Sequence, residues 1–298
     1  MSPQVPPAER RYVRLLRLYP AAYRRRRGSE LLETLLEVAA DQGRSRPSAR
    51  ETSALILGAL RAHAGYGARR SARQSWLTAF RTAALMLIVY AMADAVAQIG
   101  HHVVFRASFP YAMAGVVVLS AGALVAVLRH RYPAAVAAST AAFLLLVSMW
   151  PLVRPSDGTF WLLPLAAAVL LPLVRHRGEP SSGLLRHLPL VPLLLVGIDT
   201  GMSTPLSGLL DVLAPVVVFG IGGAGLLWLA VDERVTMAVG LFAVNVLLIQ
   251  MSFEMEGGFG ASARSTLAVA ALQIGVAAAA PALLLGAATL TTRFHSRL

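Results

Sequence analysis

The 298-residue sequence contains no cysteine and no lysine, and it has few charged residues of any kind. Without cysteine the chain has no disulfides, no thiolate nucleophile and no cysteine-based metal or iron–sulfur site. Charged residues make up 14% of the chain, whereas a soluble globular protein carries about a quarter. Hydrophobic residues make up 56%. This composition is typical of a protein that lies largely in a membrane.

The basic charge is concentrated at one end of the chain. The formal net charge is +12, and residues 1–81 hold 16 of the 27 arginines and 6 of the 15 acidic residues, which gives this segment a net charge of +10. A basic end on a membrane protein indicates a cytoplasmic position and contact with anionic lipid. Direct binding of nucleic acid is not expected, because no recognised basic motif is present.

Long apolar runs follow the basic segment, and each is long enough for a helix to cross a hydrocarbon core of ~30 Å. Short alternating segments typical of a membrane barrel are missing, so the predicted fold is all-α, a polytopic transmembrane helical bundle. We expect eight spanning helices, with two of them in the breaker-rich stretch 188–231. The eight expected spans are 82–99, 111–128, 132–151, 160–174, 188–203, 210–231, 235–253 and 266–290.

The arginines predict the orientation of these helices. With the N-terminus in the cytoplasm, eight arginines fall in inner loops and the C-terminal tail, namely Arg129, Arg131, Arg175, Arg177, Arg186, Arg234, Arg293 and Arg297. Three fall outside, namely Arg106, Arg154 and Arg264. The positive-inside rule therefore favours an arrangement with both termini in the cytoplasm.

Three amphipathic patterns precede the first apolar run. The first covers residues 8–19 and ends before Pro20. The second starts at Ser29, a good N-cap residue. The third starts at Ser48, where Glu51 completes a capping box, and its apolar side uses Leu55, Ile56 and Leu60. The predicted organisation is a disordered start, a basic cytoplasmic three-helix domain and a transmembrane helical domain, at residues 1–7, 8–73 and 74–298.

A glycine-rich segment has the residue spacing of a nucleotide-binding motif but not its structural context. Gly220, Gly222 and Gly225 fit G-x-G-x-x-G, but the segment lies inside an apolar run and does not follow a strand. Close packing of helices explains it better. The adjacent His101 and His102 are a poor pair of metal ligands, because neighbouring side chains diverge. With no catalytic constellation in the sequence, we expect neither enzymatic activity nor a cofactor or metal.

Three acids lie close to the expected hydrocarbon region. By the predicted topology Asp94, Asp199 and Asp211 fall toward the outer leaflet, and Gln98 lies one turn after Asp94 on the same face. These residues could form an outward-facing polar pocket that binds or senses a cation or a proton. The plainer alternative is that each acid lies near a helix end and extends its carboxylate to water.

Two features of the N-terminal domain are candidate contact surfaces. Arg24, Arg25, Arg26 and Arg27 form the densest charge run. Near an anionic leaflet each arginine contributes about 1 kcal/mol, so four would hold the domain to the membrane; the alternative is a solvated edge. The apolar stripe of the second helix, which could bind a protein partner, consists of Leu31, Leu32, Leu35 and Leu36.

The same segment resembles a known module. Tyr19, Pro20, Tyr23, Arg24, Arg26, Gly28 and Glu30 fit a pattern of L-Y-P, an aromatic, R-x-R, an aromatic and G-x-E. This pattern is similar to the HAAS-type, or permease-prefix, helical domain of membrane proteins from high-GC bacteria. Arg27 stands where that module usually has an aromatic. The segment from Leu57 to Arg61 is similar to the end of its third helix, and the resemblance does not extend to the membrane part.

The resemblance implies a docking or signalling domain that accompanies PadR-like transcription regulators or components of ABC transporters. A small, marginally stable core also favours a partner, the membrane or a homodimer. Our first hypothesis is therefore a regulatory protein of the bacterial plasma membrane that relays a membrane or external cue to a cytoplasmic partner. The alternative is a permease-like membrane subunit of a transporter, partnered by a separate ABC ATPase.

Overall fold

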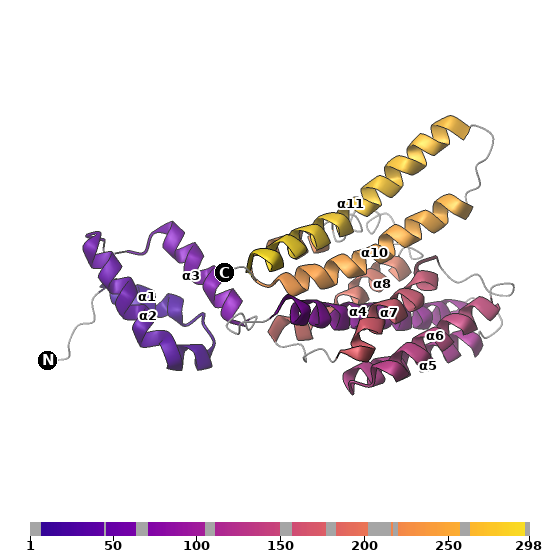
Figure 1. Cartoon of the computed structure of the whole chain (residues 1–298), viewed down its shortest axis with the longest axis horizontal. Coiled ribbons are helices and arrows are strands. Elements are labelled where there is room, and N and C mark those ends of the chain that lie inside the picture. The colour runs from indigo at the N-terminus through magenta and orange to yellow at the C-terminus, as the bar shows by residue number, and fades with distance from the viewer. Residues whose placement is uncertain are drawn as a thin grey trace. The chain divides into compact units, whose positions relative to one another are not determined.

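The structure, a computed structural model, describes residues 7–44, 46–63, 71–104, 111–149, 157–176, 183–201, 216, 220–256 and 263–295. All regular structure in these residues is helical, which confirms the predicted all-α class (Figure 1). The chain divides into two compact units, which are described separately. The N-terminal unit comprises residues 1–69 with the short segments 182–184 and 230–232, and the helical bundle comprises the remainder.

Three helices form the body of the N-terminal unit: α1 (Pro7–Leu16), α2 (Ala21–Asp41) and α3 (Ala49–His63). The prediction that the second helix starts at Ser29 is wrong, because α2 begins directly after Pro20. Pro20 has φ −53° and ψ 144°, a conformation outside the helix, and it marks the boundary. Alanine and arginine then favour the helix, and Gly28 in its interior costs only about 1 kcal/mol.

A small apolar core holds the three helices together. Its buried members are Tyr12, Leu16, Tyr19, Ala39, Leu55 and Ala59. The leucine stripe of α2 is half-buried and packs against this core. Ile56 and Leu60, which we expected on the apolar side of α3, are instead 42% and 36% exposed. The core-facing side of α3 thus uses Leu55 and Ala59, one helical turn apart.

The helical bundle is organised around α4 (Ala72–Val104). This helix contacts α5 (Tyr111–Leu128), α7 (Asp157–Arg175), α8 (Pro192–Gly201) and α10 (Glu233–Glu256). Two further helices complete the described part of the bundle: α6 (Tyr132–Met149), which packs on α5 and α7, and α11 (Ala263–His295), which packs on α10. In Figure 1, α10 and α11 run beside each other as a pair.

Three helical segments in the described residues are long and apolar enough to cross a membrane: Ala72–Gly100, Tyr111–Leu128 and Ala271–Thr292. Shorter apolar helices lie at Tyr132–Ser148, Phe160–Arg175 and Leu188–Gly197. The expected span at 210–231 falls partly outside the described residues. The count of eight spans and the sides of the termini stay predictions.

The expected helix at 188–203 is interrupted. Two 3-10 turns, η1 (Gly183–Arg186) and η2 (Leu188–Leu190), precede α8, which starts only at Pro192. Pro189 and Pro192 have no amide hydrogen, so they cannot donate the bonds that would continue an α-helix through this point. The single helix that we predicted here is therefore a short helix with a 3-10 entry.

One glycine of the G-x-G-x-x-G segment supports close helix packing. A Cβ on Gly225 would lie 3.2 Å from Val239 Cγ1 and 3.4 Å from Leu284 Cδ2. Thr236 Oγ1 also donates a hydrogen bond to the Gly225 carbonyl oxygen at 2.8 Å. A Cβ on Gly220, Gly222 or Gly223 would meet nothing within 4 Å, so the packing prediction is confirmed at Gly225 alone.

Candidate functional site

Asp94 is a buried acid on the central helix of the bundle. It lies on α4 and is 6% exposed. Gln98 Nε2, one turn later, donates a hydrogen bond to Asp94 Oδ2 at 2.6 Å, which confirms that the two side chains share a face. Leaving a buried carboxyl without its donors would cost about 1–3 kcal/mol, so Gln98 offsets part of the cost of burying Asp94. Asp94 is therefore not an acid whose carboxylate extends to the surface.

For the other two acids of the expected pocket, the structure describes only the backbone of Asp199. Asp199 lies on α8, which packs against α4, but its side chain is outside the described part of the chain. Asp211 is wholly outside the described residues. The neighbouring helices are compatible with a shared pocket, and the convergence of the three acids stays a prediction.

A second buried polar residue lies near the level of Asp94. The rings of Tyr90 on α4 and Phe242 on α10 have centroids 5.9 Å apart. Asp94 and Asn245 each follow one turn later on the same faces of these two helices. Asn245 is 1% exposed, and its Oδ1 has no hydrogen-bond partner among the described residues. The described contacts therefore supply no interhelical hydrogen bond to this amide oxygen.

Sequence reasoning missed two buried arginines, one in the first third of α4 and one in the first turn of α10. Arg81 is 5% exposed and Arg234 is 3% exposed. Close by in sequence, Ser75 Oγ on α4 donates to Glu233 Oε1 on α10 at 3.2 Å. The topology argument counted Arg234 as a loop residue, but it lies in the first turn of α10. The sequence did contain a signal for this. Residues 72–81 hold no helix breaker, so α4 can begin at Ala72, ten residues before the apolar run that we expected to span the membrane.

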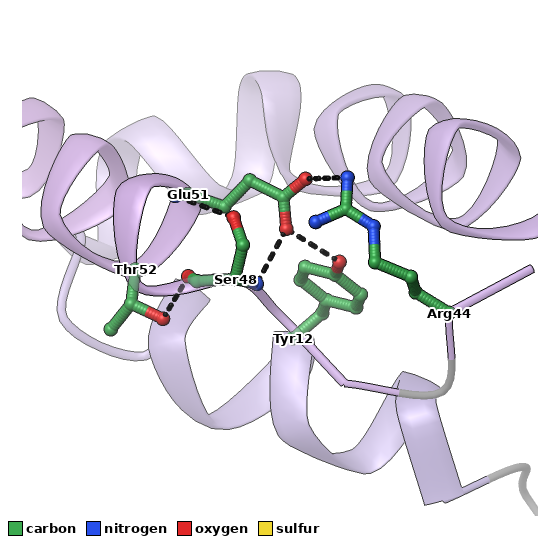
Figure 2. Close-up of polar contacts among 5 residues, drawn as sticks. All are labelled: Tyr12, Arg44, Ser48, Glu51 and Thr52. Atoms are coloured by element: carbon green, nitrogen blue, oxygen red, sulfur yellow. Dashed lines mark hydrogen bonds and ion pairs between the residues drawn. The ribbon is translucent and has the colours of Figure 1, made fainter. Parts of the chain in front are cut away.

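Glu51 is the centre of a polar network in the N-terminal unit (Figure 2). The predicted capping box is confirmed: Ser48 N–H donates to Glu51 Oε2 at 2.9 Å, and Glu51 N–H donates to Ser48 Oγ at 3.1 Å. The Tyr12 hydroxyl donates a hydrogen bond to the same Oε2 at 3.3 Å. The Arg44 guanidinium forms an ion pair with Glu51, with 3.4 Å between Arg44 Nη2 and Glu51 Oε1. This network ties α1 and the α2–α3 connection to the start of α3.

The network and the core change the proton affinities of three side chains. The Ser48 backbone hydrogen bond, helped by the charge of Arg44, holds the pKa of Glu51 below its usual value. Burial raises the pKa of Tyr12, and the Glu51 carboxylate adds to this effect. Burial also raises the pKa of Tyr19. Both tyrosines therefore keep their protons at neutral pH and act as hydrogen-bonding core residues.

The Tyr19 side chain stacks on one residue of α2 and closely approaches one residue of α3. Its ring stacks on Tyr23, with centroids 5.0 Å apart. A Cβ on Gly58 would overlap the Tyr19 hydroxyl oxygen, so α3 needs glycine at this point of closest approach. The tyrosines before and after Pro20 and the glycine of α3 thus form one packing arrangement.

The expected contact residues differ in exposure. Arg24, Arg25, Arg26 and Arg27 are all exposed on the first half of α2. Leu31, Leu32, Leu35 and Leu36 are half-buried, because they pack against the core of the unit. The arginine run is therefore free to meet a lipid surface or a partner, whereas the leucine stripe offers a smaller surface than the sequence indicated.

The described residues hold no group of three or more metal-ligating side chains. Comparison of the chain with family models, with curated proteins and with solved structures finds no match. The resemblance to the HAAS-type module stays a prediction that rests on the motif residues of the sequence alone.

Proposed function

We propose that this chain is a regulatory protein of the bacterial plasma membrane whose N-terminal unit docks on a cytoplasmic partner. The observation that supports this proposal is the N-terminal unit itself. It has its own apolar core and its own polar network, separate from those of the bundle, and it exposes a run of four arginines. A unit with so small a core gains stability from whatever it binds.

The proposed partner is a protein, and the resemblance to the HAAS-type module favours a PadR-like regulator or an ABC ATPase. The test is chemical crosslinking and co-purification with the tagged full-length protein and with a variant lacking residues 1–63. We expect a specific cytoplasmic protein only with the full-length chain. Recovery of the same proteins from both would refute the docking role. A second copy of the chain in the crosslinked product would indicate the homodimer instead.

Point variants sharpen this test. Leu32→Asp places a charge against the core of the unit and should abolish partner binding, because the unit unfolds. Arg25→Gln changes one exposed arginine of four and should barely alter binding. Binding that survives Leu32→Asp but falls with Arg25→Gln would mean that the charge run, and not the folded unit, recruits the partner.

The proposed topology has eight spans and both termini in the cytoplasm. Because the sequence contains no cysteine, single-cysteine variants give a clean test. Cysteine at Ser156 or Ala261 should react with an impermeant reagent outside intact cells, and cysteine at Ser182 should not. External labelling at Ser182 would overturn the topology.

The alternative proposal, a permease-like subunit, is favoured by one observation. Asp94 is an ionisable residue buried in the central helix, and such residues in membrane proteins commonly mark ion or substrate pathways. Transporter sites lie near the bilayer midplane. The expected span 82–99 places Asp94 in its outer half, so this observation carries less weight than the N-terminal unit with its own core.

A further inference from the structure

An exposed apolar patch lies on the N-terminal unit. Leu18, Ile56 and Leu60 are 46%, 42% and 36% exposed, and we call these three residues the apolar patch. Ile56 and Leu60 are one turn apart on α3, and His63 continues the same side of the helix. His63 Nε2 donates to the Leu18 carbonyl oxygen at 2.9 Å, which brings Leu18 to that side.

The patch has a cationic border. Residues 10–18 contain four arginines and no acid, and residues 52–63 contain one arginine and no acid. Arg14 and Arg17, just before Leu18, are both exposed. Of the six acidic residues among residues 1–69, four lie on α2, at Glu30, Glu33, Glu37 and Asp41. The surface around the patch is therefore complementary to an apolar surface that carries negative charge.

The connection between α3 and α4 is short in sequence. The end of α3 at His63 and the start of α4 at Ala72 are separated by residues 64–71. Eight residues span at most about 28 Å, since an extended chain advances ~3.5 Å per residue. If α4 crosses the bilayer, the leaflet next to its start is always within reach of the patch. This tether gives the leaflet a high effective concentration that a diffusing partner lacks.

We propose that the apolar patch docks on the anionic inner leaflet, with Leu18, Ile56 and Leu60 below the headgroups and the bordering arginines at the lipid phosphates. Arginine suits this role because its planar fork binds phosphate oxygens bidentately. A stable protein interface buries about 800 Å² on each partner, so three exposed side chains are a small contact for a protein. This inference rests on the proposed cytoplasmic position of the unit and leaves its protein-binding surface elsewhere.

The test uses the full-length protein with one cysteine introduced at Ile56. The cysteine carries an environment-sensitive fluorophore, and the protein is reconstituted in nanodiscs of phosphatidylcholine alone or mixed with phosphatidylglycerol. The matched control is Ala54→Cys, an exposed position on the opposite side of α3. With anionic lipid, we expect a blue-shifted emission at Ile56→Cys that nitroxide lipids quench, and water-like emission at Ala54→Cys.

High salt should weaken the shift at Ile56→Cys, because the Debye length falls from ~8 Å at physiological ionic strength to ~3 Å at 1 M. Emission that is water-like in both lipids would overturn the proposal. So would a blue shift that is the same in both lipids and is not quenched by nitroxide lipids, since protein would then cover the patch. Neither result bears on partner capture by the full-length chain, so failure here is distinct from failure of the docking function.

Discussion

Gly58 is the most direct test of how the N-terminal unit packs. Glycine inside a helix normally costs about 1 kcal/mol relative to alanine, so Gly58→Ala should stabilise an isolated helix. Here the new Cβ would overlap the Tyr19 hydroxyl oxygen and lie 3.4 Å from Tyr19 Cζ. Tyr19 has little freedom to move, because it is 7% exposed and stacks on Tyr23. We therefore expect Gly58→Ala to destabilise the unit.

The magnitude follows from two opposing terms. Forcing an extra carbon into a packed contact costs about 1–3 kcal/mol, and the better helix propensity of alanine returns about 1 kcal/mol. The net loss is then about 0–2 kcal/mol. Tyr19→Phe removes the hydroxyl oxygen and relieves the overlap, so in that background Gly58→Ala should gain about 0.5–1 kcal/mol. The double-mutant cycle should give a coupling energy of about 1–3 kcal/mol.

Hydrogen exchange of the full-length protein measures this coupling. Amides of α1–α3 report the N-terminal unit, amides of the bundle serve as an internal reference, and each 1.4 kcal/mol changes the exchange rate about tenfold. Ala54→Gly, at an exposed position of the same helix, reports helix propensity alone. The close approach of Tyr19 to α3 is refuted if Gly58→Ala slows hydrogen exchange in α3 by the same factor in the wild-type and the Tyr19→Phe backgrounds.

Other substitutions probe the polar contacts. Ser48→Ala removes an N-cap hydroxyl and should cost about 1 kcal/mol, seen as faster exchange in the first turn of α3. Because the pKa of Glu51 is lowered in the folded unit, its stabilising effect is present above its unfolded-state pKa and is lost as the pH falls through its folded-state pKa. Glu51→Gln should flatten that acid dependence of exchange. Gln98→Leu removes one hydrogen-bond donor to buried Asp94 and should destabilise the bundle by about 1–3 kcal/mol in thermal unfolding.

Features that depend on neighbours in sequence were predictable. The capping box at Ser48 and Glu51 was found from a three-residue spacing, because both hydrogen bonds close within one helical turn. The expected span 111–128 coincides with α5, since it is an uninterrupted apolar run that ends at Arg129. The pairing of Asp94 with Gln98 likewise follows from their four-residue spacing on one helix.

Features that depend on tertiary packing were not predictable in the same way. Ile56 and Leu60 belong to the same apolar pattern as Leu55, and only the position of α1 and α2 decides which of them is buried. The burial of Arg81 depends on α4 lying at the centre of the bundle. The start of α2 was misplaced because Ser29 is a good cap in isolation, while Pro20 already supplies the boundary.

The described polar contacts of α10 lie toward its two ends. Glu233, at its first residue, accepts from Ser75 on α4, and Ser252, in its last turns, accepts from Trp161 on α7. Bonds of this kind hold helices together in an apolar environment. Between them lie Asn245 and, on the facing side of α4, Asp94. The choice between a regulatory protein and a permease therefore centres on Asp94.

Asp94→Asn separates the two proposals. Asparagine keeps an oxygen that accepts from Gln98 Nε2, so the bundle should stay folded while the ionisable group is lost. In a permease that uses this carboxylate, the variant should abolish uptake or efflux but leave capture of a cytoplasmic partner by the N-terminal unit intact. In the regulatory protein that we propose, no transport depends on Asp94, and deletion of residues 1–63 should remove the cellular effect. Loss of a transport activity by an Asp94→Asn protein of normal stability would establish the permease. Stability and partner capture serve as controls, because a general loss of structure would change both.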